Sequence, residues 1–156
     1  MRMAAMLTAA LLLGSCAAKA PQAEGEPFSL RPFTAAGTLT WGREEYRAAL
    51  SRGADGVLTV SLQNARFAEP VVLFAGAQSQ GMRLGALSLE LPAQGGPPEN
   101  AAARLRSALS SLEGVRMRGD VWQGEGCALS VQEGVWKTLT IPEGTLSFSS
   151  VSFGGE

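Results

Sequence analysis

The residue with the clearest chemical potential is Cys16, which closes the tetrapeptide Leu13-Gly14-Ser15-Cys16 directly after a short apolar run. A cysteine thiolate is a nucleophile and can form a stable thioether. The small residues Gly14 and Ser15 leave the backbone open to a peptidase. Arg2 precedes the apolar run, so the start of the chain has the charged, apolar and small-residue regions of an export signal.

This order of an apolar residue, two small residues and a cysteine resembles the processing site of bacterial lipoproteins. The resemblance implies that residues 1–15 are a signal peptide and that cleavage falls between Ser15 and Cys16. It also implies that the Cys16 sulfur carries a diacylglycerol with palmitate-like chains, and two such chains anchor a protein firmly to a bilayer. We therefore expect an extracytoplasmic protein on the outer leaflet of the plasma membrane, or on the outer membrane if the host has one.

Two other interpretations of the N-terminus remain open. One is a transmembrane helix, although the uncharged residues 3–18 fall somewhat short of the ~20 that a bilayer requires. The other is a secretory signal that is cut elsewhere, in which case Cys16 has no special role.

Outside this motif the residue types favour no catalytic mechanism. The chain contains no histidine, so the Ser–His and Cys–His pairs of many hydrolases cannot form. Cys127 shares its expected strand face with Leu129 and Val131, and we interpret it as a small core residue. Glu44 and Glu45 are neighbours, which point to opposite faces of a strand. No cluster has metal-ligand spacing. We expect neither an enzyme nor a metal or cofactor site.

Four arginines and two tryptophans are the remaining polar and aromatic candidates. Arg116 and Arg118 share a strand face, and Arg104 and Arg106 lie just upstream on an expected helix; the set suits either a small anion or lipid head group, or an ordinary solvated face. Trp41 continues the apolar face of its strand and is expected in the core. Trp136 shares a face with Thr138 and Thr140, so it is either an exposed platform or a cross-strand packing partner.

Composition bounds the number of domains and the kinds of partner. The sequence has 156 residues with a formal net charge of −1, which suits one domain and argues against nucleic-acid binding. Residues 16–32 contain three prolines and show no periodicity, and we expect a lipidated flexible tether. Residues 33–154 form the expected domain. Nothing in the sequence indicates an oligomer, and we expect a monomer.

Alternating apolar and polar residues predict a mainly β fold with one helix. Apolar residues at helical spacing predict an amphipathic helix from Ala101 to Leu112, begun by Asn100 or a Pro97-Pro98 pair and ended by Gly114. The apolar face of the last strand switches between Phe148 and Val151, which indicates a β-bulge. About nine strands are expected, at residues 33–41, 46–51, 58–63, 71–75, 82–91, 115–121, 127–132, 135–141 and 145–153.

A sheet of this length should curl, and the helix is expected to cover its concave face. The predicted fold class is therefore α+β, mainly β: a curved antiparallel half-barrel with one helix. This order of elements resembles small lipoproteins of Gram-positive gut anaerobes. The resemblance rests on the cysteine motif, the strand that starts Phe33-Thr34-Ala35, the hairpins up to Leu91-Pro92, the helix and four C-terminal strands. The architecture in turn is similar to LolA and LprG, bacterial carriers of lipoproteins and lipoglycans, although those carriers have more helix.

The LolA/LprG resemblance implies a non-enzymatic protein that binds or transports a hydrophobic, lipid-like ligand in a cavity between sheet and helix. An alternative is an envelope scaffold or adhesion module that binds a protein or glycan through its outer surface. The candidate lining residues would equally form a plain hydrophobic core; they are Leu58, Val60, Leu62, Leu87, Leu89, Leu105, Leu109 and Met117.

Overall fold

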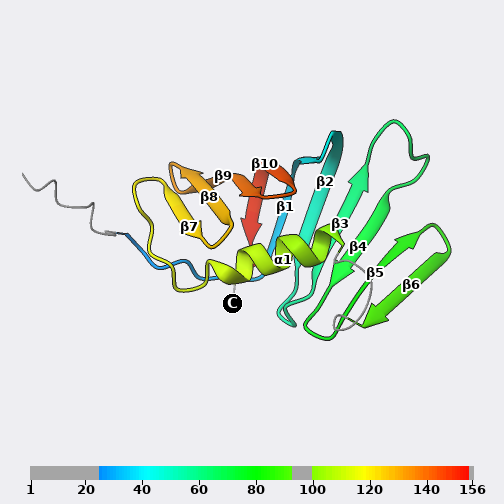
Figure 1. Ribbon diagram of the computed structural model, residues 1–156, viewed down its shortest axis with the longest axis horizontal. Coiled ribbons are helices and arrows are strands. Elements are labelled where there is room, and N and C mark those ends of the chain that lie inside the picture. The colour runs from blue at the N-terminus through cyan, green and yellow to red at the C-terminus, as the bar shows by residue number, and fades with distance from the viewer. Residues whose placement is uncertain (1–24, 93–99, 155–156) are drawn as a thin grey trace, which may run out of the picture.

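The computed structural model describes residues 25–92 and 100–154, which form one open antiparallel sheet of ten strands with a single helix (Figure 1). The strand order is β6-β5-β4-β3-β2-β1-β10-β9-β8-β7, so the first and last strands are neighbours at the centre and β6 and β7 are the two edges. The elements are β1 (Phe33–Trp41), β2 (Glu44–Arg52), β3 (Leu58–Gln63), β4 (Val71–Ala75), β5 (Ser79–Leu84), β6 (Leu87–Pro92), α1 (Ala101–Ser111), β7 (Val121–Gly124), β8 (Cys127–Gln132), β9 (Val135–Ile141) and β10 (Gly144–Phe153).

The mainly β fold is confirmed, but the predicted count of nine strands is wrong. The single strand expected at residues 82–91 is the end of β5 and the whole of β6, separated by a turn at Gly85, whose φ is +55°. Gly81, where a turn is expected from the sequence, lies within strand β5 instead. Residues 115–120 pair only through isolated bridges, because a turn at Gly119 (φ +57°) joins Arg118 to Val121.

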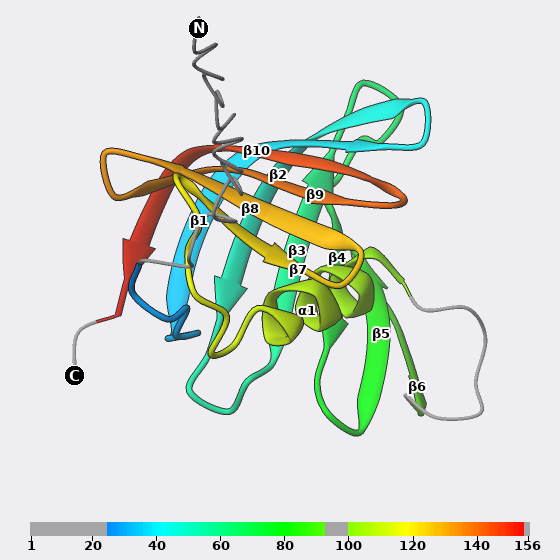
Figure 2. The ribbon, with the colours of Figure 1, turned by 60° about the vertical axis from the view of Figure 1, so that its left-hand side comes forward.

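Helix α1 begins and ends close to the predicted residues. Asn100 is the N-cap, and its side-chain oxygen accepts the backbone N–H of Ala103 at 2.9 Å. The helix ends before Gly114, whose φ of +76° suits glycine. The sheet curves around α1 (Figure 2), and the helix buries Leu105 and Leu109 against the concave face. Among the described residues, no helix is long and apolar enough to cross a bilayer.

Two β-bulges set the apolar faces at the centre of the sheet. The predicted bulge in β10 is confirmed: Ala36 pairs with Ser150 and Gly37 with Phe148, which leaves Ser149 as the extra residue. A second bulge was not predicted, and it leaves Lys137 as the extra residue of β9. Both bulges shift the side-chain alternation by one residue, so that apolar residues on either side of each bulge face the core.

The segment before β1 belongs to the folded domain. Residues 25–32 fall within the stretch expected to be tether, yet Phe28 is only 3% exposed. Backbone bonds fasten it: the N–H of Phe28 donates to the Val115 carbonyl at 2.8 Å, and the N–H of Gly114 donates to the Phe28 carbonyl at 2.9 Å. The proposed signal peptide, Ser15, Cys16 and the start of the tether lie outside the described residues.

Candidate ligand-binding surface

An apolar surface continues the core face of the sheet beyond the helix. In one row across the strands, Leu62 pairs with Val71, Val71 with Leu84, and Leu84 with Leu87. In the next row, Val60 pairs with Leu73, Leu73 with Met82, and Met82 with Leu89. Antiparallel partners lie side by side on one face. We call the outer part of both rows the apolar platform, which comprises Val71, Leu73, Met82, Leu84, Leu87 and Leu89.

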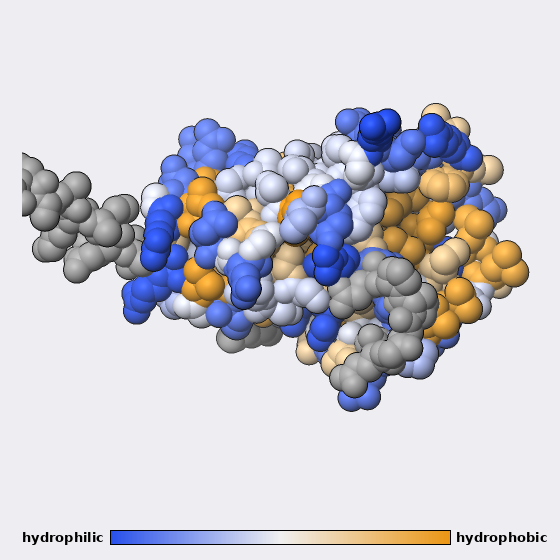
Figure 3. Space-filling model, in the orientation of Figure 1, coloured by the Kyte–Doolittle hydropathy of each residue, from blue (hydrophilic) through white to orange (hydrophobic). Residues whose placement is uncertain are grey.

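Exposure rises along each row, from buried residues on β3 through half-buried Val71 and Leu73 on β4 to exposed residues on β5 and β6. Val60 and Leu62 lie in the core, but Leu89 is 51% exposed and Leu87 is 74% exposed. Figure 3 shows the resulting hydrophobic surface at the side of the molecule where β4 to β6 lie. Contiguous apolar surface of this kind marks ligand, membrane or protein contacts more often than single exposed leucines do.

The position of α1 explains why this helix does not cover the platform. Asn100 fixes the start of the helix against β4 and β5: its side-chain amide donates to the Gly81 carbonyl at 3.0 Å, and its backbone N–H donates to Gln80 Oε1 at 2.9 Å. From there the helix runs over β3 and the inner strands, away from β6 (Figure 1). The rows of Leu87 and Leu89 therefore receive no cover from α1.

The structure does not gather the eight predicted lining residues into one site. Leu58, Val60, Leu62, Leu105 and Leu109 meet under α1, where each is buried as part of the packed core. Leu87 and Leu89 lie on the apolar platform. Met117 is half-buried beside Gly25, on the segment that leads to β7.

Four of the six platform residues were not predicted from the sequence, and they are Val71, Leu73, Met82 and Leu84. The strand register shows that the position of one turn would have indicated them. Met82 and Leu84 reach the platform only when the turn is placed at Gly85, because that turn sets them opposite Leu89 and Leu87. The two residues from β4, Val71 and Leu73, then follow from the pairing of β4 with β5.

A buried polar group borders the apolar platform. Gln80 lies on β5 two residues before Met82, which places both side chains on the same face. It is 3% exposed, and its Nε2 has no hydrogen-bond partner within the described part of the chain. A buried donor without a partner costs about 1–3 kcal/mol. The boundary between platform and helix therefore contains a buried hydrogen-bond donor, Gln80 Nε2, that has no acceptor among the described residues.

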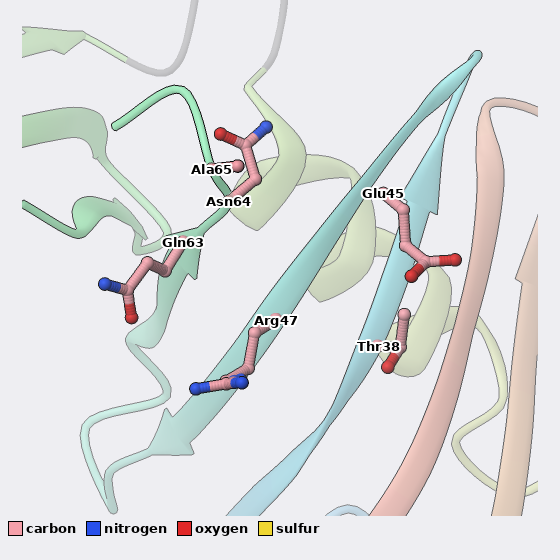
Figure 4. A pocket seen from close by; sticks show the side chains of 6 residues that line it. All are labelled: Thr38, Glu45, Arg47, Gln63, Asn64 and Ala65. Atoms are coloured by element: carbon pink, nitrogen blue, oxygen red, sulfur yellow. The ribbon is translucent and has the colours of Figure 1, made fainter. Parts of the chain in front are cut away.

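A polar hollow lies on the convex face of the sheet, opposite to the face that carries the platform (Figure 4). It has a volume of about 510 Å³ and is lined by Thr38, Glu45, Arg47, Gln63, Asn64 and Ala65. The register places Arg47 between Thr38 and Gln63 on neighbouring strands. This hollow presents hydroxyl, carboxylate, guanidinium and amide groups to solvent, which is a hydrogen-bonding set rather than a hydrophobic one.

The four arginines do not form one group. Arg104 forms an ion pair with Glu143 in the β9–β10 turn, and its hydrogen bond lowers the pKa of that carboxyl below the ordinary value. Arg106 Nε donates to the Gly56 carbonyl at 3.1 Å. Arg116 Nη1 donates to the Gly25 carbonyl at 3.4 Å. Arg118 is exposed in the turn before β7.

Trp136 is a packing residue rather than an exposed platform. It is buried, and its ring lies within 6 Å of four phenylalanine rings, those of Phe28, Phe33, Phe148 and Phe153. The predicted sharing of a face with Thr138 is wrong because the bulge at Lys137 turns Trp136 toward the core. Trp41 packs half-buried against the same core, as predicted.

Cys127 is buried, as its strand pattern predicted. Its Sγ lies 3.2 Å from Ser111 Oγ and 3.5 Å from the Ala108 carbonyl oxygen, so it packs against α1. The side chain of Glu44 pairs with Arg66 at 2.8 Å, whereas Glu45 lines the convex hollow. These two carboxylates thus lie on opposite faces. Among the described residues, no three potential ligands cluster to hold a metal ion.

Comparisons with protein families, with curated proteins and with solved structures return no match for this chain. The site therefore rests on the geometry of the sheet and on the residues themselves.

Proposed function

We propose that this protein is a membrane-anchored extracytoplasmic lipoprotein whose domain binds a hydrophobic, lipid-like ligand without chemical conversion. The apolar platform carries the proposal, because it continues two core rows of the sheet and leaves Leu87 and Leu89 exposed. Covering such a surface with an acyl chain removes apolar area from water, which contributes about 25 cal/mol per Å². The acyl anchor proposed at Cys16 would hold the domain close to a source of such chains.

We further propose that the fold is a half-barrel of the LolA/LprG type. The curved open sheet and the helix on its concave face support this (Figure 2). Under α1, however, Leu105, Leu109 and Leu112 are fully or almost fully buried among the leucines of the sheet. The ligand would therefore lie beside the helix, on the platform, rather than beneath it.

Displacement of a fluorescent fatty-acid probe tests the site. The full chain is produced with Cys16→Ser, so that no acyl chain is attached to the protein itself. We expect the Leu87→Ser/Leu89→Ser variant to weaken probe binding at least tenfold, because polar side chains remove apolar contact area. Val135→Ser is the matched control, since Val135 is 45% exposed but lies on β9, away from the platform. Equal binding by both variants would rule out the platform.

A second candidate function is binding of a glycan or protein through the outer surface. The polar hollow around Arg47 on the convex face supports it, because its groups can donate to and accept from hydroxyls. A glycan array with the same protein and with Arg47→Ala tests this. Binding that depends on Arg47 but not on Leu87 would favour the outer surface over the platform.

A further inference from the structure

The end of the apolar platform next to α1 collects hydrogen-bond donors. The first backbone N–H groups of a helix have no acceptor within the helix. In α1, the Asn100 side chain accepts the N–H of Ala103, and the Asn100 carbonyl accepts that of Arg104. The N–H groups of Ala101 and Ala102 therefore receive no cap from Asn100. Both residues are buried, and the first turn contains no acidic residue.

Gln80 adds a side-chain donor at the same place. Its Oε1 accepts the backbone N–H of Asn100 at 2.9 Å, so the amide group lies against the start of the helix. This bond also settles the orientation of the amide, because a backbone N–H can only donate and must face the oxygen. The group left without a partner in the described chain is therefore Nε2, a donor.

Donors at the start of a helix favour a negative charge, since the helix dipole is positive at that end. The nearest platform residue on β5 is Met82, two residues after Gln80 and on the same face of the strand. A ligand that fits both features has an apolar chain and an anionic acceptor at one end.

We propose that the ligand of the platform is a single-chain amphiphile with a carboxylate head, as in a long-chain fatty acid. The chain lies across Met82, Leu84, Leu87 and Leu89, and the carboxylate accepts hydrogen bonds from Gln80 Nε2 and from the first turn of α1. This proposal rests on the proposed hydrophobic-ligand function and adds the chemistry and the direction of the head group.

Calorimetric titration with two ligands of equal chain length tests the head group. The ligands are decanoate and decan-1-ol, each below its aggregation concentration, and the protein is the full chain with Cys16→Ser. We expect decanoate to bind about tenfold more tightly than decanol, the effect of charge-assisted hydrogen bonds. Gln80→Glu keeps the oxygen that accepts from Asn100, removes the donor and adds a like charge. It should lower the affinity for decanoate at least tenfold and change the affinity for decanol by less than twofold.

A second variant acts without adding charge. Ala101→Pro removes one N–H at the first helical position, where proline is well tolerated. The preceding residue is compatible, because Asn100 is extended with φ −74° and ψ 171°. We expect decanoate affinity to fall about threefold, with decanol affinity unchanged. This variant also serves if Gln80→Glu does not fold.

The outcomes distinguish failure of the head-group proposal from failure of the proposed hydrophobic-ligand function. If decanoate and decanol bind with equal affinity, and neither Gln80→Glu nor Ala101→Pro changes it, the carboxylate head group is overturned. The platform still stands in that case if Leu87→Ser lowers the affinity for both ligands. Binding of neither ligand, or binding that Leu87→Ser does not change, would overturn the platform as well.

Discussion

The rings of Phe28 and Trp136 lie 5.8 Å apart between their centroids, so the segment before β1 packs directly on the start of β9. A second ring, that of Trp122, meets Phe28 edge to face at 5.2 Å. Aromatic pairs of this kind contribute about 0.5–1.5 kcal/mol beyond the burial of their area. The N-terminal segment is thereby part of the core and fixes where a tether leaves the domain.

Removal of the Phe28 ring is expected to destabilise the domain strongly. Phe28→Ala should lower the free energy of unfolding by about 3–5 kcal/mol, because it leaves a cavity among aromatic rings. Urea denaturation followed by tryptophan fluorescence measures this. Phe67→Ala is the control, since Phe67 is 37% exposed and, within the described part of the chain, its ring stacks on Tyr46 alone; about 1 kcal/mol is expected there. Equal losses would show that Phe28 is not a core residue.

Asn100 has two separable roles at the start of α1. Asn100→Ala should cost about 2 kcal/mol, because the N-cap and the bond to the Gly81 carbonyl are both lost. Asn100→Asp keeps the acceptor for the N–H of Ala103 but loses the donor to Gly81, so it should cost clearly less. Thermal unfolding of the three proteins checks the order. If Asn100→Ala were as stable as the parent, the proposed role of Asn100 as N-cap and as donor to the Gly81 carbonyl would be contradicted.

The Arg104–Glu143 ion pair makes a small, pH-dependent contribution. Because Arg104 lowers the pKa of Glu143 in the folded state, the contribution is present above the unfolded pKa of about 4.3 and is lost as pH falls through the folded value. Both side chains are partly exposed, so we expect less than about 1 kcal/mol at pH 7. Glu143→Gln should therefore be less stable than the parent at pH 7 and equal to it near pH 2. A difference that persists at pH 2 would contradict this.

Lipidation at Cys16 is directly testable in cells, because the chain has only one other cysteine. After growth with an alkyne analogue of palmitate, the parent protein and Cys127→Ser should both carry the label, whereas Cys16→Ser should not. Cys127 is the matched control because its thiol is buried and packs against α1. Label on Cys16→Ser would exclude Cys16 as the sole acylation site.

The sequence was sufficient for the strands whose alternation is regular and for the helix. Leu58, Val60 and Leu62 alternate without interruption, and all three are buried. The sequence pattern was not sufficient in β9, where one extra residue changes the alternation. The bulge at Lys137 turns Trp136 into the core, and nothing in the local pattern distinguishes that bulge from a regular strand.

The candidate site shows the same limit. Leu87 and Leu89 were identified as apolar residues of a strand, but their exposure depends on where α1 lies across the sheet. The start of the helix is fixed by Asn100 and Gln80, a contact between residues far apart in the chain. The unpartnered donor on Gln80 also follows from this contact and has no local sequence signal.

The pairing of β1 with β10 has a consequence for how the chain folds. These two strands form the centre of the sheet, yet β1 starts at Phe33 and β10 ends at Phe153. The two halves, β1 to β6 and β7 to β10, can each assemble from consecutive hairpins, but they join only when β10 is complete. Contacts between distant residues form slowly. A chain that crosses a membrane from its N-terminus would therefore acquire its continuous core last, once the final strand has emerged.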